Sequence, residues 1–278
     1  PHDDRAVPVS VTAVPGFLAA GAACGVKASG ADDLAMVATA DGSPVTAAGV
    51  FTSNKMTAPP VLVTREHLAA TGGRAAAVVL NSGNANAATG AAGMADAELM
   101  CTLTAEALGC SPDEVLVCST GLIGFPLPMD RIIPAIPLLA GALTVDGGPA
   151  AARAIMTTDT VPRTTITTGT TLDGDTFTIG GVAKGAAMIG PNMATMLAVV
   201  MTDVSLTSDQ ADRVLRQAVD TSFNCISVEG HTSTSDSVLL LAGGEPGVAE
   251  GDADFEAIRV AVRDVCQDLA RAIVSDAE

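Results

Sequence analysis

Thr195 is the residue with the most distinctive chemical setting in this sequence. It lies within GPNMATML (190–197), between a glycine–proline pair and the apolar run 196–201. A threonine hydroxyl becomes a nucleophile when its own α-amine, with a pKa of about 8, acts as the base. That amine exists only if the bond between Ala194 and Thr195 is cut, which attack of the Thr195 hydroxyl on the preceding carbonyl would achieve. The alternative is a structural threonine at the entrance of a buried strand.

Acyl chemistry at such a hydroxyl also needs hydrogen-bond donors that stabilise an oxyanion. Ser119-Thr120-Gly121 follows the short apolar run 115–118 and combines hydroxyl groups with a backbone N–H beside a flexible glycine. Thr120 and Gly121 are therefore candidates for an oxyanion hole. A simple turn at the end of a strand would explain the same residues.

Other routes to catalysis lack their motifs. The sequence has no GxSxG elbow, no P-loop and no GxGxxG after a strand. His67 lies in a helical context and His231 in the polar stretch EGHTSTSD, and a surface or loop role is favoured for both. The six cysteines form no CxxC pair and are typical of small buried residues in a reducing compartment. We expect no zinc or other metal site, no disulfide framework and no cofactor.

Composition excludes several classes of partner. The 278 residues have a formal charge of −17, and 48% of them are hydrophobic but only 2% aromatic. Such a chain is globular with an aliphatic core, and it repels phosphate backbones and anionic lipid surfaces. No run approaches the ~18 apolar residues of a membrane span, and the first residues lack the apolar core of a secretion signal. We expect a cytoplasmic protein that binds neither nucleic acid nor membranes.

Strand and helix patterns are interleaved along the chain. Strands are expected at residues 75–80, 115–118, 196–201 and 237–244, at two places between Val45 and Val63, and as a hairpin over 164–179. Helices are expected at residues 95–108, after the capping box Thr207–Gln210, and from about Asp254. The asparagine-rich stretch 81–90 predicts a turn. Because the order lacks an even βαβ rhythm, it favours an α+β fold with helices layered on sheets.

Five motifs occur in a fixed order and carry a resemblance. They are VVLNSGNANAATG (78–90), CSTGLIGFPLPMDRI (118–132), MTTDTVPR (156–163), VAKGAAMIGPNMATML (182–197) and SFNCISVEGHTSTSD (222–236). Together they resemble the ornithine acetyltransferase family (glutamate N-acetyltransferase, arginine biosynthesis) over about Val9 to Glu278. The resemblance implies a layered αββα sandwich. It also implies a precursor that cuts itself into an α chain, residues 1–194, and a β chain that begins with residues 195–278.

The resemblance also implies roles for individual residues. The released Thr195 takes acetyl from N-acetylornithine and passes it to glutamate, with Thr120 and Gly121 as the oxyanion hole. Thr157, Lys184 and Thr195 correspond to substrate-binding positions, and a fixed cation at Lys184 suits the α-carboxylate that both substrates share. Glu278 matches an acidic residue that would bind the ornithine ammonium. The family implies an α2β2 heterotetramer, and whether acetyl-CoA is a second donor stays open.

The sequence departs from the family pattern in two motifs and at its end. Gly190 stands where a polar residue is more usual. Cys225 stands where the family usually has arginine, and acidic residues are usual near Glu229 and His231. The chain stops at Glu278 without a stop signal. Because family members continue past this point, we expect further residues beyond it.

Two other functions use the same observations. A self-cleaving aminopeptidase or amidase would employ the same terminal hydroxyl on another acyl group, but TTDT and AKG belong to the acetyltransferase pattern. A non-catalytic protein that keeps the fold would be expected to have lost Thr195 or the pair Thr120-Gly121, and all three are present.

Overall fold

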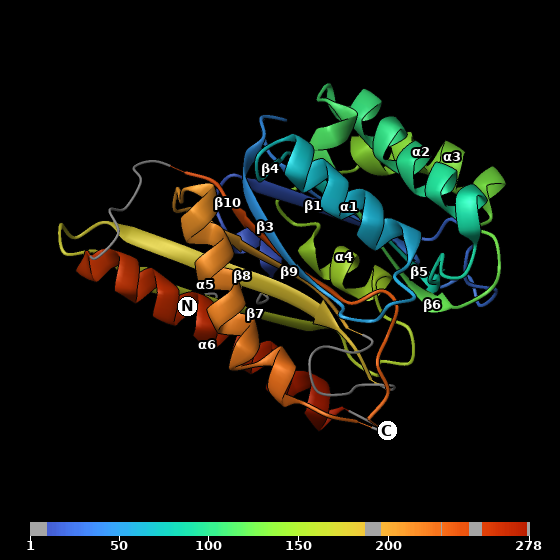
Figure 1. Ribbon diagram of the computed structural model, residues 1–278. Helices are drawn as coiled ribbons and strands as arrows, with labels where there is room; N and C mark the ends of the chain where they lie inside the picture. The colour runs from blue at the N-terminus through green and yellow to red at the C-terminus, as the bar shows by residue number, and fades with distance from the viewer. Residues whose placement is uncertain (1–9, 187–195, 229, 245–251, 277–278) are drawn as a thin grey trace, which may run out of the picture.

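The computed structural model describes residues 10–186, 196–228, 230–244 and 252–276, and these form two stacked β-sheets (Figure 1). Within these ranges the first sheet has four strands, in the spatial order β1 (Phe17–Ala22), β2 (Leu34–Thr39), β5 (Ala77–Asn84) and β6 (Val115–Leu122). The second has six, in the order β4 (Arg74–Ala75), β3 (Val45–Phe51), β10 (Ser237–Ala242), β9 (Leu197–Thr202), β8 (Thr176–Lys184) and β7 (Arg163–Thr170). Two neighbouring pairs are parallel, β5 with β6 and β9 with β10.

The inner faces of the two sheets pack together through aliphatic side chains. Val78 and Leu80 of β5 belong to the same buried cluster as Val199 of β9 and Leu239 of β10. The short helices η1 (Val11–Ala13) and α4 (Gly148–Ala154) add residues to this cluster. Each fully buried aliphatic side chain contributes about 1.5–3 kcal/mol, so this inter-sheet core is a main source of stability.

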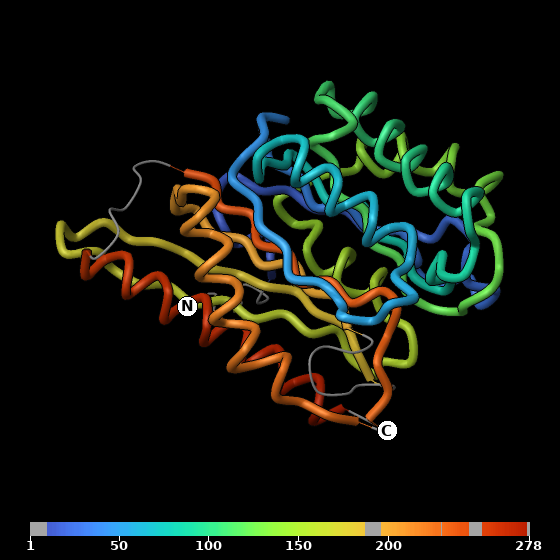
Figure 2. The backbone as a smooth tube through the Cα atoms, viewed as in Figure 1, coloured from blue at the N-terminus to red at the C-terminus, as the bar shows by residue number. Residues whose placement is uncertain are grey.

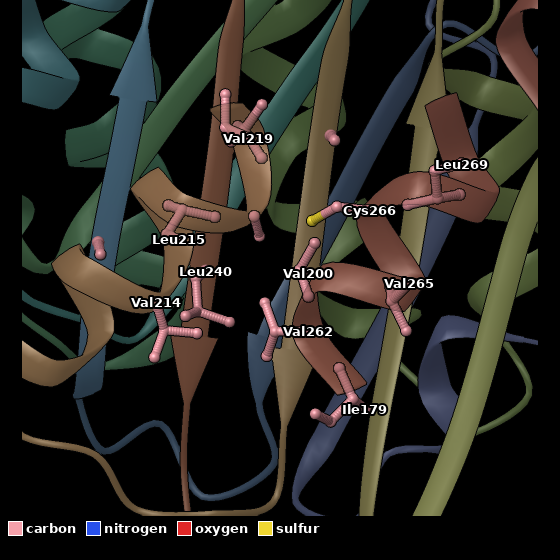
Figure 3. Packing of buried hydrophobic residues seen from close by; sticks show 14 of the residues in the cluster. Ile179, Val200, Val214, Leu215, Val219, Leu240, Val262, Val265, Cys266 and Leu269 are labelled. Atoms are coloured by element: carbon pink, nitrogen blue, oxygen red, sulfur yellow. The ribbon is translucent and has the colours of Figure 1, made fainter. Parts of the chain in front are cut away.

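Helices cover the outer faces of both sheets. Helices α2 (Gly90–Leu108) and α3 (Met129–Gly141) pack on the first sheet, and α1 (Pro59–Ala70) lies beside its edge strand β6. Helices α5 (Ser208–Asp220) and α6 (Ala253–Ser275) cover the second sheet, and Figure 3 shows their aliphatic side chains meeting Val200 and Leu240. The predicted α+β fold with αββα layers is therefore confirmed.

Most expected elements occur where the sequence places them. The hairpin is β7–β8, with Gly174 at φ +92° in its turn, and α2 ends at Gly109 with φ +78°. Thr207 and Gln210 form the expected capping box of α5. Two short 3-10 helices, η2 (Pro112–Glu114) and η3 (Phe223–Cys225), complete the described elements.

Three local expectations are wrong. The second strand expected before Val63 is the first turn of α1, because Pro59 and Pro60 stand where a helix needs no N–H donors and where their fixed φ is helical. The turn expected from Asn81 starts later, because β5 continues to Asn84. The cysteines are not uniformly buried: three are buried, two are half-buried and Cys225 is exposed.

The expected division between residues 194 and 195 does not separate two sheets. Strands β8 and β9, which precede and follow it, are antiparallel neighbours from Ile179↔Thr202 to Lys184↔Leu197 (Figure 2). Both expected chains thus contribute strands to one sheet. In the described parts of the chain, no helix has the length and apolar character to cross a membrane.

Candidate active site

A cavity of about 620 Å³ lies where β6 and β8 end. Four of the predicted site residues line it: Thr120, Gly121, Thr157 and Lys184. They come from the end of β6, the segment after α4, and the end of β8. The fold therefore brings together residues that three separate motifs contribute.

Lys184 is the central polar group of this cavity. Its side chain is 1% exposed, and its Nζ donates hydrogen bonds to Thr157 Oγ1 at 2.6 Å and to Thr120 Oγ1 at 3.4 Å. Burial lowers the pKa of Lys184 below its ordinary value, whereas the carboxylate of Asp159, 3.8 Å from Nζ, acts in the opposite direction. The result is a cation held in a fixed position beside two hydroxyl groups.

Asp159 organises the polar side of the site, and sequence reasoning gave it no role. Its side chain is fully buried. Its Oδ2 accepts a hydrogen bond from the N–H of Thr157 at 2.8 Å. Its Oδ1 accepts a hydrogen bond from the N–H of Gly185 at 2.7 Å and forms an ion pair with Arg163. Burial raises the pKa of Asp159, but Lys184, the two N–H donors and Arg163 together hold it below its ordinary value. Asp159 is thus an ionised anchor between the TTDT and AKG motifs.

Arg163 extends this network to the end of α6. It pairs with Asp276, and its Nε donates to the Ala272 carbonyl at 3.0 Å. Asp276 also accepts the N–H of Thr160 at 2.9 Å. The segment that carries Thr157 is therefore tied to the last described helix as well as to Lys184.

The other wall of the cavity is made by two glycines at the ends of β5 and β6. Gly121 has φ +133°, and a Cβ there would lie 2.3 Å from the carbonyl carbon of Gly83 and 2.5 Å from the nitrogen of Asn84. The strand register also shifts at Asn84, which takes both Thr120 and Leu122 as partners. Such a bulge releases backbone groups from the regular ladder, so this wall suits the binding of a small polar group.

The start of β9 is anchored beside the same cavity. The N–H of Met196 donates to Oδ1 of the buried Asp236 at 2.9 Å, and Leu197 lies opposite Lys184 in the sheet. Asp236 directly follows Ser233-Thr234-Ser235, which line the cavity. The two residues that follow Thr195 in sequence thus lie at this end of the sheet.

Several predicted residues lie outside the described residues. They are Ala194, Thr195, Glu229 and Glu278.

A second lysine in the cavity, Lys27, was missed by sequence reasoning because it belongs to no motif. Its loop is held by the buried Asp33, whose carboxylate accepts the N–H groups of Cys24 at 2.7 Å, Gly25 at 3.1 Å and Lys27 at 2.8 Å. Ser233, Thr234 and Ser235 were missed too, although they stand inside a quoted motif. Their hydroxyl-rich run was the only available signal.

The histidines and Cys225 lie outside this site. His67 Nδ1 is 2.7 Å from the carbonyl oxygen of Val115, which is a structural contact, and His231 is exposed. Cys225 is exposed, with its thiol donating to the Asp220 carbonyl at 3.2 Å. Across the described ranges, no group of three or more His, Cys, Asp or Glu side chains is arranged to hold a metal ion.

Comparison with known proteins decides the family. The ArgJ family model matches residues 18–278. The chain belongs to the ArgJ family. The arginine biosynthesis bifunctional protein ArgJ of Streptomyces coelicolor is 47% identical over 270 residues, which are 97% of this chain and 68% of that protein. The corresponding protein of Thermosynechococcus vestitus is 47% identical over 271 residues, 96% of this chain and 64% of that protein. The ArgJ proteins are acetyltransferases of arginine biosynthesis, and this chain is one of them.

Solved structures agree with this assignment. The ornithine acetyltransferase of Mycobacterium tuberculosis complexed with ornithine is 45% identical with a TM-score of 0.61, covering 66% of this chain and 96% of that chain. The L-aminopeptidase D-Ala-esterase/amidase of Ochrobactrum anthropi, described as a variant of the Ntn hydrolase fold, has a TM-score of 0.53 over 97% of this chain. At 15% identity, that second likeness shows a shared fold alone.

Proposed function

We propose that this chain is a self-cleaving acetyltransferase that moves acetyl from N-acetylornithine to glutamate through an acetyl ester of Thr195. The observation that carries the proposal is the meeting of Thr120, Gly121, Thr157 and Lys184 at one cavity. Strand β9, which starts two residues after Thr195, begins beside it. A nucleophile, a wall for an oxyanion and a cation for a carboxylate are the parts that acyl transfer between amino acids needs.

The first proposed step is cleavage of the chain. The Thr195 hydroxyl attacks the Ala194 carbonyl carbon, the peptide C–N bond breaks, and water hydrolyses the resulting ester. This leaves a carboxylate on Ala194 and a free α-amine on Thr195, while the paired β8 and β9 hold the two products together. Chain length supports this step: about 183 of the 278 residues here account for 96% of the M. tuberculosis chain, which is thus about 190 residues long. That is close to the length of the proposed α chain.

Transfer follows in two half-reactions. The Thr195 α-amine takes the hydroxyl proton, Oγ1 attacks the acetyl carbonyl, and the oxyanion is held by Thr120 and Gly121. The C–N bond then breaks, and ornithine leaves with its amine protonated. In the second half the α-amine of glutamate attacks the ester, the C–O bond breaks and Oγ1 regains a proton. Lys184 and Thr157 bind the shared α-carboxylate throughout, and Glu278 binds the ornithine ammonium.

Three further properties belong to the same proposal. The relatives are named bifunctional, which supports a second activity, and we propose acetyl-CoA as its alternative donor. The chemistry requires no metal and no other cofactor. The proposed assembly is an α2β2 heterotetramer in the cytoplasm.

The test is a product balance on the purified full-length protein. N-acetylornithine and glutamate are supplied together, and ornithine, N-acetylglutamate and acetate are separated and quantified. The proposal predicts ornithine and N-acetylglutamate in equal amounts, with neither formed by Thr195→Ala. Ornithine with free acetate and no N-acetylglutamate would instead indicate an amidase, which is the competing use of this fold.

A further inference from the structure

Lysine is rare in this chain, and its distribution is uneven. The 278 residues contain three lysines, Lys27, Lys55 and Lys184, in a protein of formal charge −17. Lys27 and Lys184 line the same cavity, whereas Lys55 is exposed in the loop after β3. No aspartate or glutamate is among the described residues that line this cavity. Asp159 lies behind Lys184, and Asp32 and Asp33 lie near Lys27, but none of these carboxylates lines the cavity. The two cations that do line it suit a ligand with two negative charges.

Lys27 is held in position and does not simply extend into solvent. Its backbone N–H binds the buried Asp33, and its Cγ would lie 3.0 Å from a Cβ placed on Gly83, so its stem runs along the Gly83 wall. Its Nζ donates to the Asp32 carbonyl at 2.6 Å. That bond uses one of the three donors of an ammonium group, and a ligand can accept from the others.

The two lysines also influence each other electrically. Burial is the main cause that lowers the pKa of Lys184, and the positive charge of Lys27 adds to this effect. Burial likewise lowers the pKa of Lys27, whereas the carboxylates of Asp33, Asp32 and Asp159 act in the opposite direction. Two like charges at one cavity destabilise each other, and an anion bound between them relieves this repulsion.

We propose that Lys27 binds the side-chain carboxylate of the acceptor glutamate, while Lys184 binds the α-carboxylate that donor and acceptor share. This rests on the proposed function, because it assigns the two substrates to one cavity in turn. Glutamate carries a carboxylate where ornithine carries an ammonium, so a cation at Lys27 favours the acceptor over the donor. Lys27 is thereby a specificity-determining residue of the second half-reaction.

The experiment compares variants in the two half-reactions separately, using the full-length protein. Lys27→Met keeps the stem and removes the charge, Lys27→Arg keeps a charge, and Lys55→Met removes the charge of an exposed lysine that does not line the cavity. The first half-reaction is acetyl-enzyme formation from N-acetylornithine, followed by mass spectrometry. Acceptor specificity is kcat/KM for glutamate divided by that for glutamine, which has the same length and no side-chain charge.

Lys27→Met should lower the glutamate-to-glutamine ratio by about 10–100-fold, the usual effect of losing a charge-assisted hydrogen bond. The first half-reaction should stay within about twofold, because the donor has no second carboxylate. Lys27→Arg should recover most of the ratio, and Lys55→Met should behave as wild type. Circular dichroism checks the fold, and Lys27→Gln provides the same test if the methionine variant does not fold.

Two results would overturn the proposal. An unchanged ratio would mean that Lys27 does not meet the side-chain carboxylate, and equal losses in both half-reactions would mean that it only shapes the loop or meets the shared carboxylate. A wild-type protein that forms no acetyl adduct would contradict the proposed function instead. In that case the affinities of wild type and Lys27→Met for glutamate and glutamine, measured by calorimetry without any donor, would still test the role of Lys27.

Discussion

Asp159 is the buried anion that holds two cations near the candidate active site, and Asp159→Asn tests this quantitatively. The change keeps the size of the side chain and removes its charge. In the structure Asp159 Oδ2 lies 3.8 Å from Lys184 Nζ, and Oδ1 pairs with Arg163. Both cations would stay buried with less countercharge.

The size of the effect follows from the distance. Two unit charges 3.8 Å apart interact by about 4 kcal/mol at an effective dielectric constant of about 20. Removing one partner of a buried ion pair typically costs about 3–5 kcal/mol, which agrees. We therefore expect Asp159→Asn to lower the free energy of unfolding by about 3–5 kcal/mol at pH 7.

The effect should depend on pH in a defined direction. The pKa of Asp159 is lower in the folded protein than its ordinary value. Its stabilising contribution is therefore complete above the unfolded pKa of about 3.9 and is lost as the pH falls through the folded pKa. The stability difference between wild type and Asp159→Asn should be full at pH 7 and shrink in strong acid.

The assay is thermal and urea-induced unfolding of the full-length protein. Asp146→Asn, at an exposed position, is the matched control and should change stability by about 0.5 kcal/mol or less. The double variant Asp159→Asn/Lys184→Met should lose less stability than the two single variants lose together. The reason is that removing Lys184 also removes the buried cation that Asp159→Asn leaves without its partner. A loss below about 1 kcal/mol for Asp159→Asn, or strict additivity, would refute the reasoning.

Three further outcomes follow from the site. Thr195→Ala should show neither cleavage nor an acetyl adduct by mass spectrometry, and Thr195→Ser should retain some of both; transfer by the alanine variant would contradict the nucleophile. Gly121→Ala should lower kcat by about 100-fold or more, because the added Cβ meets the backbone of the neighbouring strand. Gly124→Ala is the control, since Gly124 also has a positive φ but has open space around it, and kcat should not fall. Equal kinetics for the two variants would show that the close approach of the backbone at Gly121 does not matter for catalysis. Glutamate binding, followed by calorimetry, should weaken as the pH rises through the lowered pKa values of Lys184 and Lys27, and at lower pH still in Asp159→Asn. Binding that stays constant above the ordinary pKa of lysine would argue against both cations.

Sequence patterns predicted those parts of the fold that depend on short-range signals. The capping box at Thr207, the glycine at the end of α2 and the hairpin turn at Gly174 each specify local backbone geometry, and all were found. The start of α1 was misread because its apolar residues lack helical periodicity near Pro59, where proline geometry decides instead. Register between distant strands was beyond such reasoning.

The site shows the same limit. Thr120, Gly121, Thr157 and Lys184 were predicted from their motifs, and the structure brings them to one cavity. Lys27 could not be predicted, because its place depends on a loop folded around a buried carboxylate and on the packing of β5 beside it. Long-range contacts of this kind leave no pattern in a single sequence.

The central claim is tested most directly by the intact mass of the purified full-length protein, before and after N-acetylornithine is added. We predict two fragments that meet between Ala194 and Thr195, with the second gaining the mass of one acetyl group. Glutamate added afterwards should remove that acetyl group. A single uncut chain that gains no acetyl mass would contradict both the cleavage and the acetyl-threonine intermediate.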